Sequence, residues 1–141
     1  MNSISPVALV TGAGTGIGRA VALALLQAGY RVVLAGRRAE PLNEVAQASG
    51  TAHAYPFCAD VGQPDSVDQL FAMIKAKFGR LDLLFNNAGV GSFMVNIEDI
   101  TYAQWQTVVD ANLTGSFLCA QGAIRIMKHQ TPQGGRIINN G

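Results

Sequence analysis

The chain has 141 residues, the length of one domain, and its composition is that of a folded protein with little net charge. The apolar fraction is 49% and only 13% of the residues are charged, which excludes intrinsic disorder. Because 10 Lys and Arg balance 9 Asp and Glu, we expect no basic surface that would hold a nucleic acid or an anionic membrane.

Apolar runs and helical patterns alternate in the first third of the chain. Buried strands are expected at residues 7–10 and 32–35, since short apolar runs without alternation are typical of strands covered on both faces. Between them the pattern predicts a helix from about residue 16 to 28, ended by Gly29, and a shorter helix follows at residues 39–48. We expect the apolar face of the first helix to consist of Ile17, Ala20, Val21, Ala24 and Leu25.

A third strand and an amphipathic helix follow in the middle of the chain. Residues 52–58 predict the strand, and Pro56 restricts it to an irregular or edge-like end because proline cannot donate to a sheet. The helix is bounded by Pro64, at a first-turn position, and by Gly79. Its apolar positions have the spacing of one helix face and are Val67, Leu70, Phe71 and Ile74.

The last third predicts two more strands buried on both faces, at residues 81–85 and 137–138, with a long helix between them. This helix runs from Thr101, which forms a candidate capping box with Gln104, to about Gln130. The whole order of strands and helices predicts an α/β fold with a doubly wound parallel sheet, and no linker divides residues 1–141 into domains.

The cysteines and the apolar runs indicate the compartment. Cys58 and Cys119 stand far apart in apolar surroundings, which favours buried free thiols over a metal site or a disulfide. No basic segment precedes the first apolar run, and no run approaches the ~20 residues of a membrane span. We therefore expect a cytoplasmic protein without a metal site or a membrane anchor.

A glycine-rich turn, residues 11–18, joins the first strand to the first helix. A dinucleotide pyrophosphate needs a tight turn, backbone without Cβ atoms near the phosphates, and free N–H groups at a helix N-terminus. Glycine also serves ordinary strand-to-helix loops, so the turn alone does not decide between the two interpretations. The residues expected to contact the cofactor here are Gly12, Thr15, Gly16, Ile17 and Gly18.

Two arginines stand at the end of the second strand, where a dinucleotide site needs a group for the adenosine ribose. No carboxylate is present to accept from a 2′-hydroxyl, whereas guanidinium groups bind a 2′-phosphate with bidentate geometry. We therefore favour NADP(H) over NAD(H), with Arg37 as the main phosphate contact and Arg38 assisting. The alternative is that both arginines are solvated charges at a strand end.

Four motifs follow one another along the chain: Thr11-Gly12-x-x-x-Gly16-x-Gly18, Asp60-Val61, Asn86-Asn87-Ala88-Gly89 and Asn112. In this order they resemble the motifs of the classical short-chain dehydrogenases/reductases, and the resemblance covers the chain from about Val7 onward. It implies a Rossmann-type fold and hydride transfer between NADP(H) and a carbonyl or alcohol on a small-molecule substrate.

The resemblance also implies roles for individual residues. Asp60 would accept a hydrogen bond from the adenine amino group, with Val61 packed beside the ring. The segment Asn87, Ala88 and Gly89 would face the cofactor as well as close a turn. Asn112, which we place inside the long helix, would hold a water in a proton relay and is the one catalytic residue expected in this chain.

The family's Tyr-x-x-x-Lys pattern is not found in this sequence, because Leu34, Ala59 and Gln106 stand four residues after the only tyrosines. The segment 135–141 resembles the strand that leads to the family's catalytic Ser. We therefore expect a Rossmann-type sheet truncated after about five strands, in an N-terminal portion that is inactive alone. The complete protein is expected to form a homo-oligomer, and apolar side chains of the long helix are expected to be exposed.

Two other functions are alternatives to that of an oxidoreductase. A dinucleotide-binding module or sensor without catalysis fits the chain as it stands. A Rossmann-type methyltransferase is disfavoured because Arg37 and the Asn-Asn-Ala-Gly segment would have no role in it. Nothing in the sequence identifies the substrate.

Overall fold

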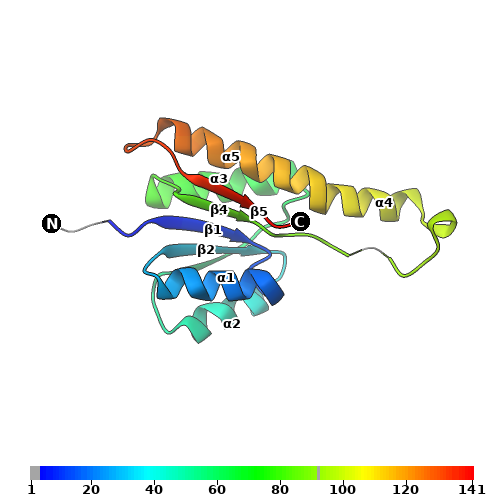
Figure 1. Cartoon of the computed structure of the whole chain (residues 1–141), viewed down its shortest axis with the longest axis horizontal. Helices are drawn as coiled ribbons and strands as arrows, with labels where there is room; N and C mark the ends of the chain where they lie inside the picture. The colour runs from blue at the N-terminus through cyan, green and yellow to red at the C-terminus, as the bar shows by residue number, and fades with distance from the viewer. Residues whose placement is uncertain (1–3, 92) are drawn as a thin grey trace.

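The computed structural model describes residues 4–91 and 93–141, and its centre is a sheet of five parallel strands in the order β3-β2-β1-β4-β5. In Figure 1 the arrows of the strands point in one direction. The strands are β1 (Val7–Thr11), β2 (Arg31–Gly36), β3 (Ala54–Cys58), β4 (Leu83–Asn86) and β5 (Arg136–Asn139). The predicted doubly wound α/β sheet is confirmed, and the arrangement is a Rossmann-like fold.

Helices cover both faces of the sheet. On one face α1 packs on β1 and β2 and α2 packs on β2 and β3, while on the other α5 packs on α3, β4 and β5 (Figure 1). The helical segments are α1 (Gly16–Gln27), α2 (Ala39–Ser49), α3 (Pro64–Phe78), η1 (Ile97–Asp99), α4 (Tyr102–Val109), η2 (Asp110–Thr114) and α5 (Gly115–His129).

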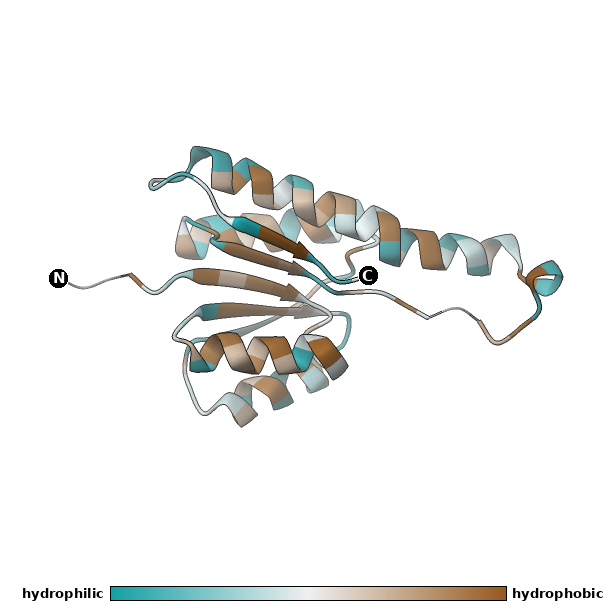
Figure 2. Cartoon of the chain, in the orientation of Figure 1, coloured by the Kyte–Doolittle hydropathy of each residue, from teal (hydrophilic) through white to brown (hydrophobic). Residues whose placement is uncertain are grey.

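The strands β1 and β2 alternate their side chains between two apolar clusters, one on each face. Val7 and Leu9 of β1 belong to the cluster under α3 and α5, whereas Ala8 and Val10 belong to the cluster under α1 and α2. Figure 2 shows the apolar strands in the middle of the molecule and more mixed colours on the helices. Both sides of β1 are buried, because parallel strands with helices on each face have no side open to water.

Several predicted local signals are confirmed. Gly29 and Gly79 follow α1 and α3 with φ angles of 92° and 70°, a conformation that favours glycine at a helix end. The capping box of α4 is formed, since Gln104 N–H donates to Thr101 Oγ1 at 3.1 Å and Gln104 Oε1 accepts from Thr101 N–H at 3.0 Å. The strand with Pro56 is the edge strand β3.

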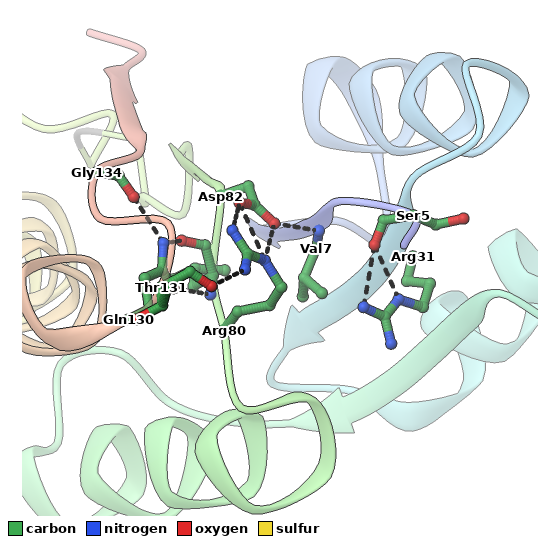
Figure 3. Close-up of polar contacts among 9 residues, drawn as sticks. Ser5, Val7, Arg31, Arg80, Asp82, Gln130, Thr131 and Gly134 are labelled. Atoms are coloured by element: carbon green, nitrogen blue, oxygen red, sulfur yellow. Dashed lines mark hydrogen bonds and ion pairs between the residues drawn. The ribbon is translucent and has the colours of Figure 1, made fainter. Parts of the chain in front are cut away.

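A polar cluster closes the amino ends of β1 and β4, and Figure 3 shows its contacts. Asp82 accepts from Val7 N–H at 2.8 Å and from two nitrogens of Arg80, whose third nitrogen donates to the carbonyl of Thr131. The carboxamide of Gln130 bonds to both the N–H and the C=O of Leu81. These bonds satisfy backbone groups before β4 and tie the end of α5 to the sheet.

The predicted buried face of α1 is only partly right: Val21 and Leu25 are partly buried against the sheet, but the other three residues are not. Ile17 is 59% exposed, and Ala20 and Ala24 are exposed as well. The sheet instead receives Gly18, Ala22 and Leu26. Small residues let this helix approach the strands closely: a Cβ on Gly18 would lie 2.6 Å from Asn87 Nδ2. Of the bulky residues on the predicted face, Val21 and Leu25 lie beside this contact, and Ile17 points to solvent.

Two further expectations are corrected by the packing. Cys58 is exposed rather than buried, because it ends an edge strand, whereas Cys119 of α5 is fully buried. The strand β5 is not covered on both faces, and of its four residues only Ile137 is partly buried. In the described residues β5 forms the second edge of the sheet.

The long helical stretch from α4 to α5 does not keep one geometry. Its length matches the prediction, but η2 between α4 and α5 is a π-helical turn, and Asn112 lies within it rather than in an α-helix. Such turns often occur at functional sites, because the wider turn moves a side chain and its carbonyl away from the α-helical pattern. Exposed apolar side chains along the stretch, as expected, include Trp105, Leu113, Phe117 and Ile124.

Candidate functional site

A cleft of about 170 Å³ opens at the carboxyl ends of β1, β2, β3 and β4. In open parallel sheets this is where ligands bind, at the point where the strand order reverses from β1 to β4. The segment after each of the four strands contributes residues to the cleft. The lining consists of Gly12, Gly14, Thr15, Ala35, Gly36, Arg37, Arg38, Pro41, Leu42, Ala59, Asp60, Val61, Ala88, Gly89, Val90 and Ala111.

The glycine-rich turn brings the N-terminus of α1 to this cleft. Gly12 and Gly16 have φ angles of 62° and 54°, which L side chains rarely adopt. The N-cap residue Thr15 makes no side-chain hydrogen bond to the helix, and no acidic residue occupies the first turn. The first N–H groups of α1 and the positive end of its dipole are therefore available to an anion.

Asn87 and Thr11 hold the turn in place from the neighbouring strand end. The Asn87 amide donates to the carbonyls of Thr11 at 3.2 Å and Gly12 at 3.3 Å. In return the buried hydroxyl of Thr11 accepts from the N–H groups of Asn87 and Ala88, at 2.9 and 3.0 Å. A Cβ on Gly12 would lie 2.9 Å from Asn87 Nδ2, so only glycine fits here without displacing Asn87.

Arg37 and Arg38 directly follow β2 and line the cleft. Both are exposed, and within residues 4–91 and 93–141 neither belongs to an ion pair. Arg38 is the N-cap residue of α2, whose first turn adds Pro41 and Leu42 to the lining. The two guanidinium groups therefore place unneutralised positive charge beside the glycine-rich turn.

Asp60 and Val61 follow β3 and lie at another wall of the cleft. Asp60 Oδ1 accepts from Gly62 N–H at 3.0 Å, and Asp60 N–H donates to Ser66 Oγ at 2.8 Å. These bonds fix the turn and leave Oδ2 free of hydrogen bonds within the described part of the chain. Val61 is buried against Gly115, where a Cβ would lie 2.6 Å from the Val61 side chain.

Asn112 joins the π-helical turn to the loop after β4. Its Oδ1 accepts from Val90 N–H at 2.8 Å and its Nδ2 donates to Val90 O at 2.9 Å. Gly89 makes room for this contact, since a Cβ there would lie 2.6 Å from Asn112 Oδ1. The side chain is thus engaged with the backbone, and the carbonyl of Asn112 accepts the Ser116 hydroxyl at 3.1 Å.

The structure brings most of the predicted site residues to the cleft. The predicted residues that line it are Gly12, Thr15, Arg37, Arg38, Asp60, Val61, Ala88 and Gly89. The predicted residues that do not line it are Gly16, Ile17, Gly18, Asn87 and Asn112. Gly18 and Asn87 support the turn from behind, while the Ile17 side chain is turned to solvent.

Some lining residues were missed by the sequence reasoning. Ala59 and Val90 adjoin predicted residues and could have been included on that ground. Pro41 and Leu42 carry no sequence signal for a site, because they reach the cleft only through the packing of α2 on β2. A Cβ on Gly14 would lie 2.9 Å from Pro41 Cβ, which shows how closely the turn and α2 approach each other.

The groups whose pKa values are shifted lie outside the cleft. Burial raises the pKa of the Cys119 thiol to about 12. At Asp82, burial opposes ionisation, but the hydrogen bonds from Arg80 and from Val7 N–H outweigh it and lower the pKa of the carboxyl group. Within the described residues no group of three or more His, Cys, Asp or Glu side chains could hold a metal ion. No helix there is long and apolar enough to cross a bilayer.

Comparisons with known proteins agree with the fold. The family model described as short chain dehydrogenase matches residues 6–141. A 3beta-hydroxysteroid dehydrogenase from Mediterraneibacter gnavus is 39% identical over 136 residues, covering 94% of this chain and 48% of its own length. A 3-oxoacyl-acyl-carrier-protein reductase from Synechocystis is 41% identical over 140 residues, covering 94% of this chain and 54% of its own length.

Solved structures of short-chain oxidoreductases have the same fold as this chain. A metagenomic short-chain oxidoreductase in complex with NADP superposes with a TM-score of 0.88 at 34% identity, over 95% of this chain and 61% of that one. A short-chain dehydrogenase from Streptomyces avermitilis superposes with a TM-score of 0.85 at 30% identity, over 98% of this chain and 49% of that one. The chain thus spans about half the length of the curated relatives it matches.

Proposed function

The chain belongs to the short-chain dehydrogenase family, and from this premise we propose that it forms the NADP(H)-binding part of an oxidoreductase. The substrate is a small molecule whose carbonyl or alcohol carbon exchanges a hydride with the cofactor. The observation that carries the proposal is that the uncapped N-terminus of α1 and the two arginines, Arg37 and Arg38, meet at one cleft. When bound, the nicotinamide supplies or accepts the hydride.

The glycine-rich turn is the proposed pyrophosphate site. Gly12, Gly16 and Gly18 keep side chains away from the phosphates, and the first N–H groups of α1 donate to them. Thr15 lines the cleft and has a hydroxyl that makes no helix cap, so it can donate to a phosphate oxygen. Ile17 contributes through its backbone N–H, because its side chain faces solvent.

Arg37 and Arg38 are proposed to bind the 2′-phosphate that distinguishes NADP(H) from NAD(H). A guanidinium group binds a phosphate dianion through parallel N–H donors, and no carboxylate stands at the end of β2 to repel it. The solved relative in complex with NADP supports this assignment. The N-terminus of α2 begins directly after Arg38, but Glu40 in its first turn offsets the positive end of that helix dipole, so the two guanidinium groups carry the assignment.

The segments after β3 and β4 form the remaining walls of the cleft and are assigned to other parts of the dinucleotide. Asp60 has an oxygen that can accept from the adenine amino group, and Val61 offers an apolar contact to the ring. Ala88 and Gly89 line the cleft after β4 and admit the cofactor because their side chains are small, while Asn87 holds the glycine-rich turn that faces them.

Asn112 is proposed to serve the proton transfer through its main chain. The carboxamide is held by Val90, so a water of a proton relay would bind to the carbonyl of the π-helical turn instead.

The proton donor itself is proposed to lie outside these 141 residues, in a complete, homo-oligomeric, cytoplasmic protein. The Tyr-x-x-x-Lys pattern that the resemblance calls for is not in the sequence, and residues 1–141 would then be an incomplete Rossmann domain. The same observation supports the second candidate, a dinucleotide-binding module or sensor without catalysis. Carbonyl-dependent oxidation of NADPH by the complete protein would decide between them.

Calorimetric titration of the chain with NADPH and with NADH tests the cofactor assignment. We expect NADPH to bind at least about tenfold more tightly, as one charge-assisted contact to the 2′-phosphate would give. Arg37→Asp should abolish the preference by repelling that phosphate. Arg125→Asp makes the same charge change on an exposed part of α5 and should leave it intact. Equal affinities of the unaltered chain for both nucleotides would refute the assignment.

A further inference from the structure

Two pairs of asparagines connect the carboxyl ends of β4 and β5. Asn86 Nδ2 donates to Asn139 Oδ1 at 3.1 Å, and one residue further along Asn140 Nδ2 donates to Asn87 Oδ1 at 2.8 Å. The two pairs have different neighbours. Asn86 continues to the carbonyl of Ser116 on α5, whereas Asn87 continues to the carbonyls of the glycine-rich turn.

The orientation of the Asn87 carboxamide follows from its surroundings. Its nitrogen faces two carbonyl oxygens, those of Thr11 and Gly12, and only the NH₂ group can donate to them. The oxygen must therefore point the other way, where Asn140 presents a donor. If the amide rotated by half a turn, its oxygen would face two carbonyl oxygens, and Asn140 Nδ2 would face an NH₂ group that cannot accept.

The position of this amide matters because it is wedged into the turn. A Cβ on Gly12 would lie 2.9 Å from Asn87 Nδ2, and a Cβ on Gly18 would lie 2.6 Å from the same atom. The amide thus touches both the start of the turn and the first helical turn of α1, and it fixes where the N–H groups at the helix end point.

We propose that Asn140 is a positioning residue for the dinucleotide: by donating to Asn87 Oδ1 it locks the amide that holds the glycine-rich turn open toward the pyrophosphate. The proposal rests on the proposed function of the cleft. Asn140 does not line the cleft and acts through Asn87 alone.

The backbone makes Asn140 suitable for substitution. Its N–H donates to Asn86 O at 2.9 Å, which continues the pairing of β4 with β5 whatever the side chain. The side chain itself is exposed, so its removal leaves no cavity. Asn139 is the matched control, because Asn139→Ala removes an amide–amide bond between the same two strands without touching Asn87.

The test is NADPH binding by calorimetry in the intact chain, with the free energy of unfolding measured alongside. We expect Asn140→Ala to weaken binding about fivefold to tenfold, the effect of one hydrogen bond. Asn140→Asp should weaken it further, since a carboxylate oxygen would face Asn87 Oδ1. Asn139→Ala should change the affinity less than about twofold, even if it lowers stability as much as Asn140→Ala does.

A double-mutant cycle with Asn87→Ala separates positioning from general destabilisation. In the Asn87→Ala background, Asn140→Ala should have no further effect on NADPH affinity. An effect of Asn140→Ala that persists in that background, or that Asn139→Ala reproduces, would overturn the inference. If the unaltered chain bound NADPH and Arg37→Asp weakened it while Asn140→Ala did not, only this inference would fail. If the unaltered chain bound no dinucleotide, the proposed function would fail with it.

Discussion

Asn112 and Val90 are joined by two hydrogen bonds, one in each direction between the carboxamide and the backbone. The contact resembles a short strand pairing and connects the π-helical turn η2 to the loop after β4. The two residues lie next in sequence to Gly89 and Ala111, which both line the cleft. A single side chain therefore couples the long helix to the cleft.

Asn112→Ala should lower the free energy of unfolding by about 2 kcal/mol, because two hydrogen bonds of roughly 1 kcal/mol each are lost. The amide of Val90 should also exchange its hydrogen faster. Urea denaturation and hydrogen exchange measure the two effects. Asn43→Ala, on the exposed side of α2, is the control and should cost less than about 0.5 kcal/mol. Protection of Val90 N–H that survives the Asn112 substitution would contradict the role of this pair.

Gly16 and Gly50 form a matched pair for testing the phosphate site. Both have a positive φ, 54° and 66°, and both have open space where a Cβ would be. Alanine should therefore cost about 1 kcal/mol of backbone strain at either position. Only Gly16→Ala should weaken NADPH binding, by about tenfold, since Gly50 ends α2 away from the turn. Equal dinucleotide affinity of the two variants would place the pyrophosphate elsewhere.

Asp82 should make stability depend on pH. Its pKa in the folded chain is lowered, because the bonds from Arg80 and Val7 N–H outweigh the cost of burial. The stabilisation is therefore complete above the unfolded pKa of about 4 and is lost as the pH falls through the lower folded value. Asp82→Asn should cost roughly 1 to 2 kcal/mol at pH 7 and progressively less below pH ~4.

Urea denaturation at a series of pH values tests the Asp82 prediction. Glu44→Gln removes an exposed carboxylate of α2 and serves as the comparison. A gap between the unaltered chain and Asp82→Asn that stays constant down to pH ~2 would show that the carboxylate charge is not responsible.

The two thiols should differ in reactivity. Cys119 is fully buried and its pKa is raised to about 12, whereas Cys58 is exposed at the end of β3. An aromatic disulfide reagent at pH 8 should therefore label one thiol quickly in the folded chain and the second only on unfolding. Cys58→Ser should remove the fast phase and Cys119→Ser should retain it. Two equivalents released together from the folded chain would contradict this assignment.

Local patterns predicted much of the backbone. Gly29 and Gly79 end helices, Thr101 and Gln104 cap one, and Pro56 lies on an edge strand, as expected. Helix ends and caps depend on residues within a few positions of one another, and a proline restricts its own strand, so the sequence contains the signal for each. The parallel, doubly wound sheet followed from the alternation of strands with helices, since parallel pairing requires crossovers on the faces of a sheet.

The sequence by itself determined the class of fold and the residues that follow the carboxyl ends of the strands, because strand ends and tight turns are local properties of the chain. Only the tertiary structure decided which face of α1 is buried, that Cys58 is exposed, and that Asn140 meets Asn87. Burial and long-range hydrogen bonds depend on which elements approach one another and how closely. Small side chains such as Gly18 set that approach, and their effect appears only when the elements are packed together.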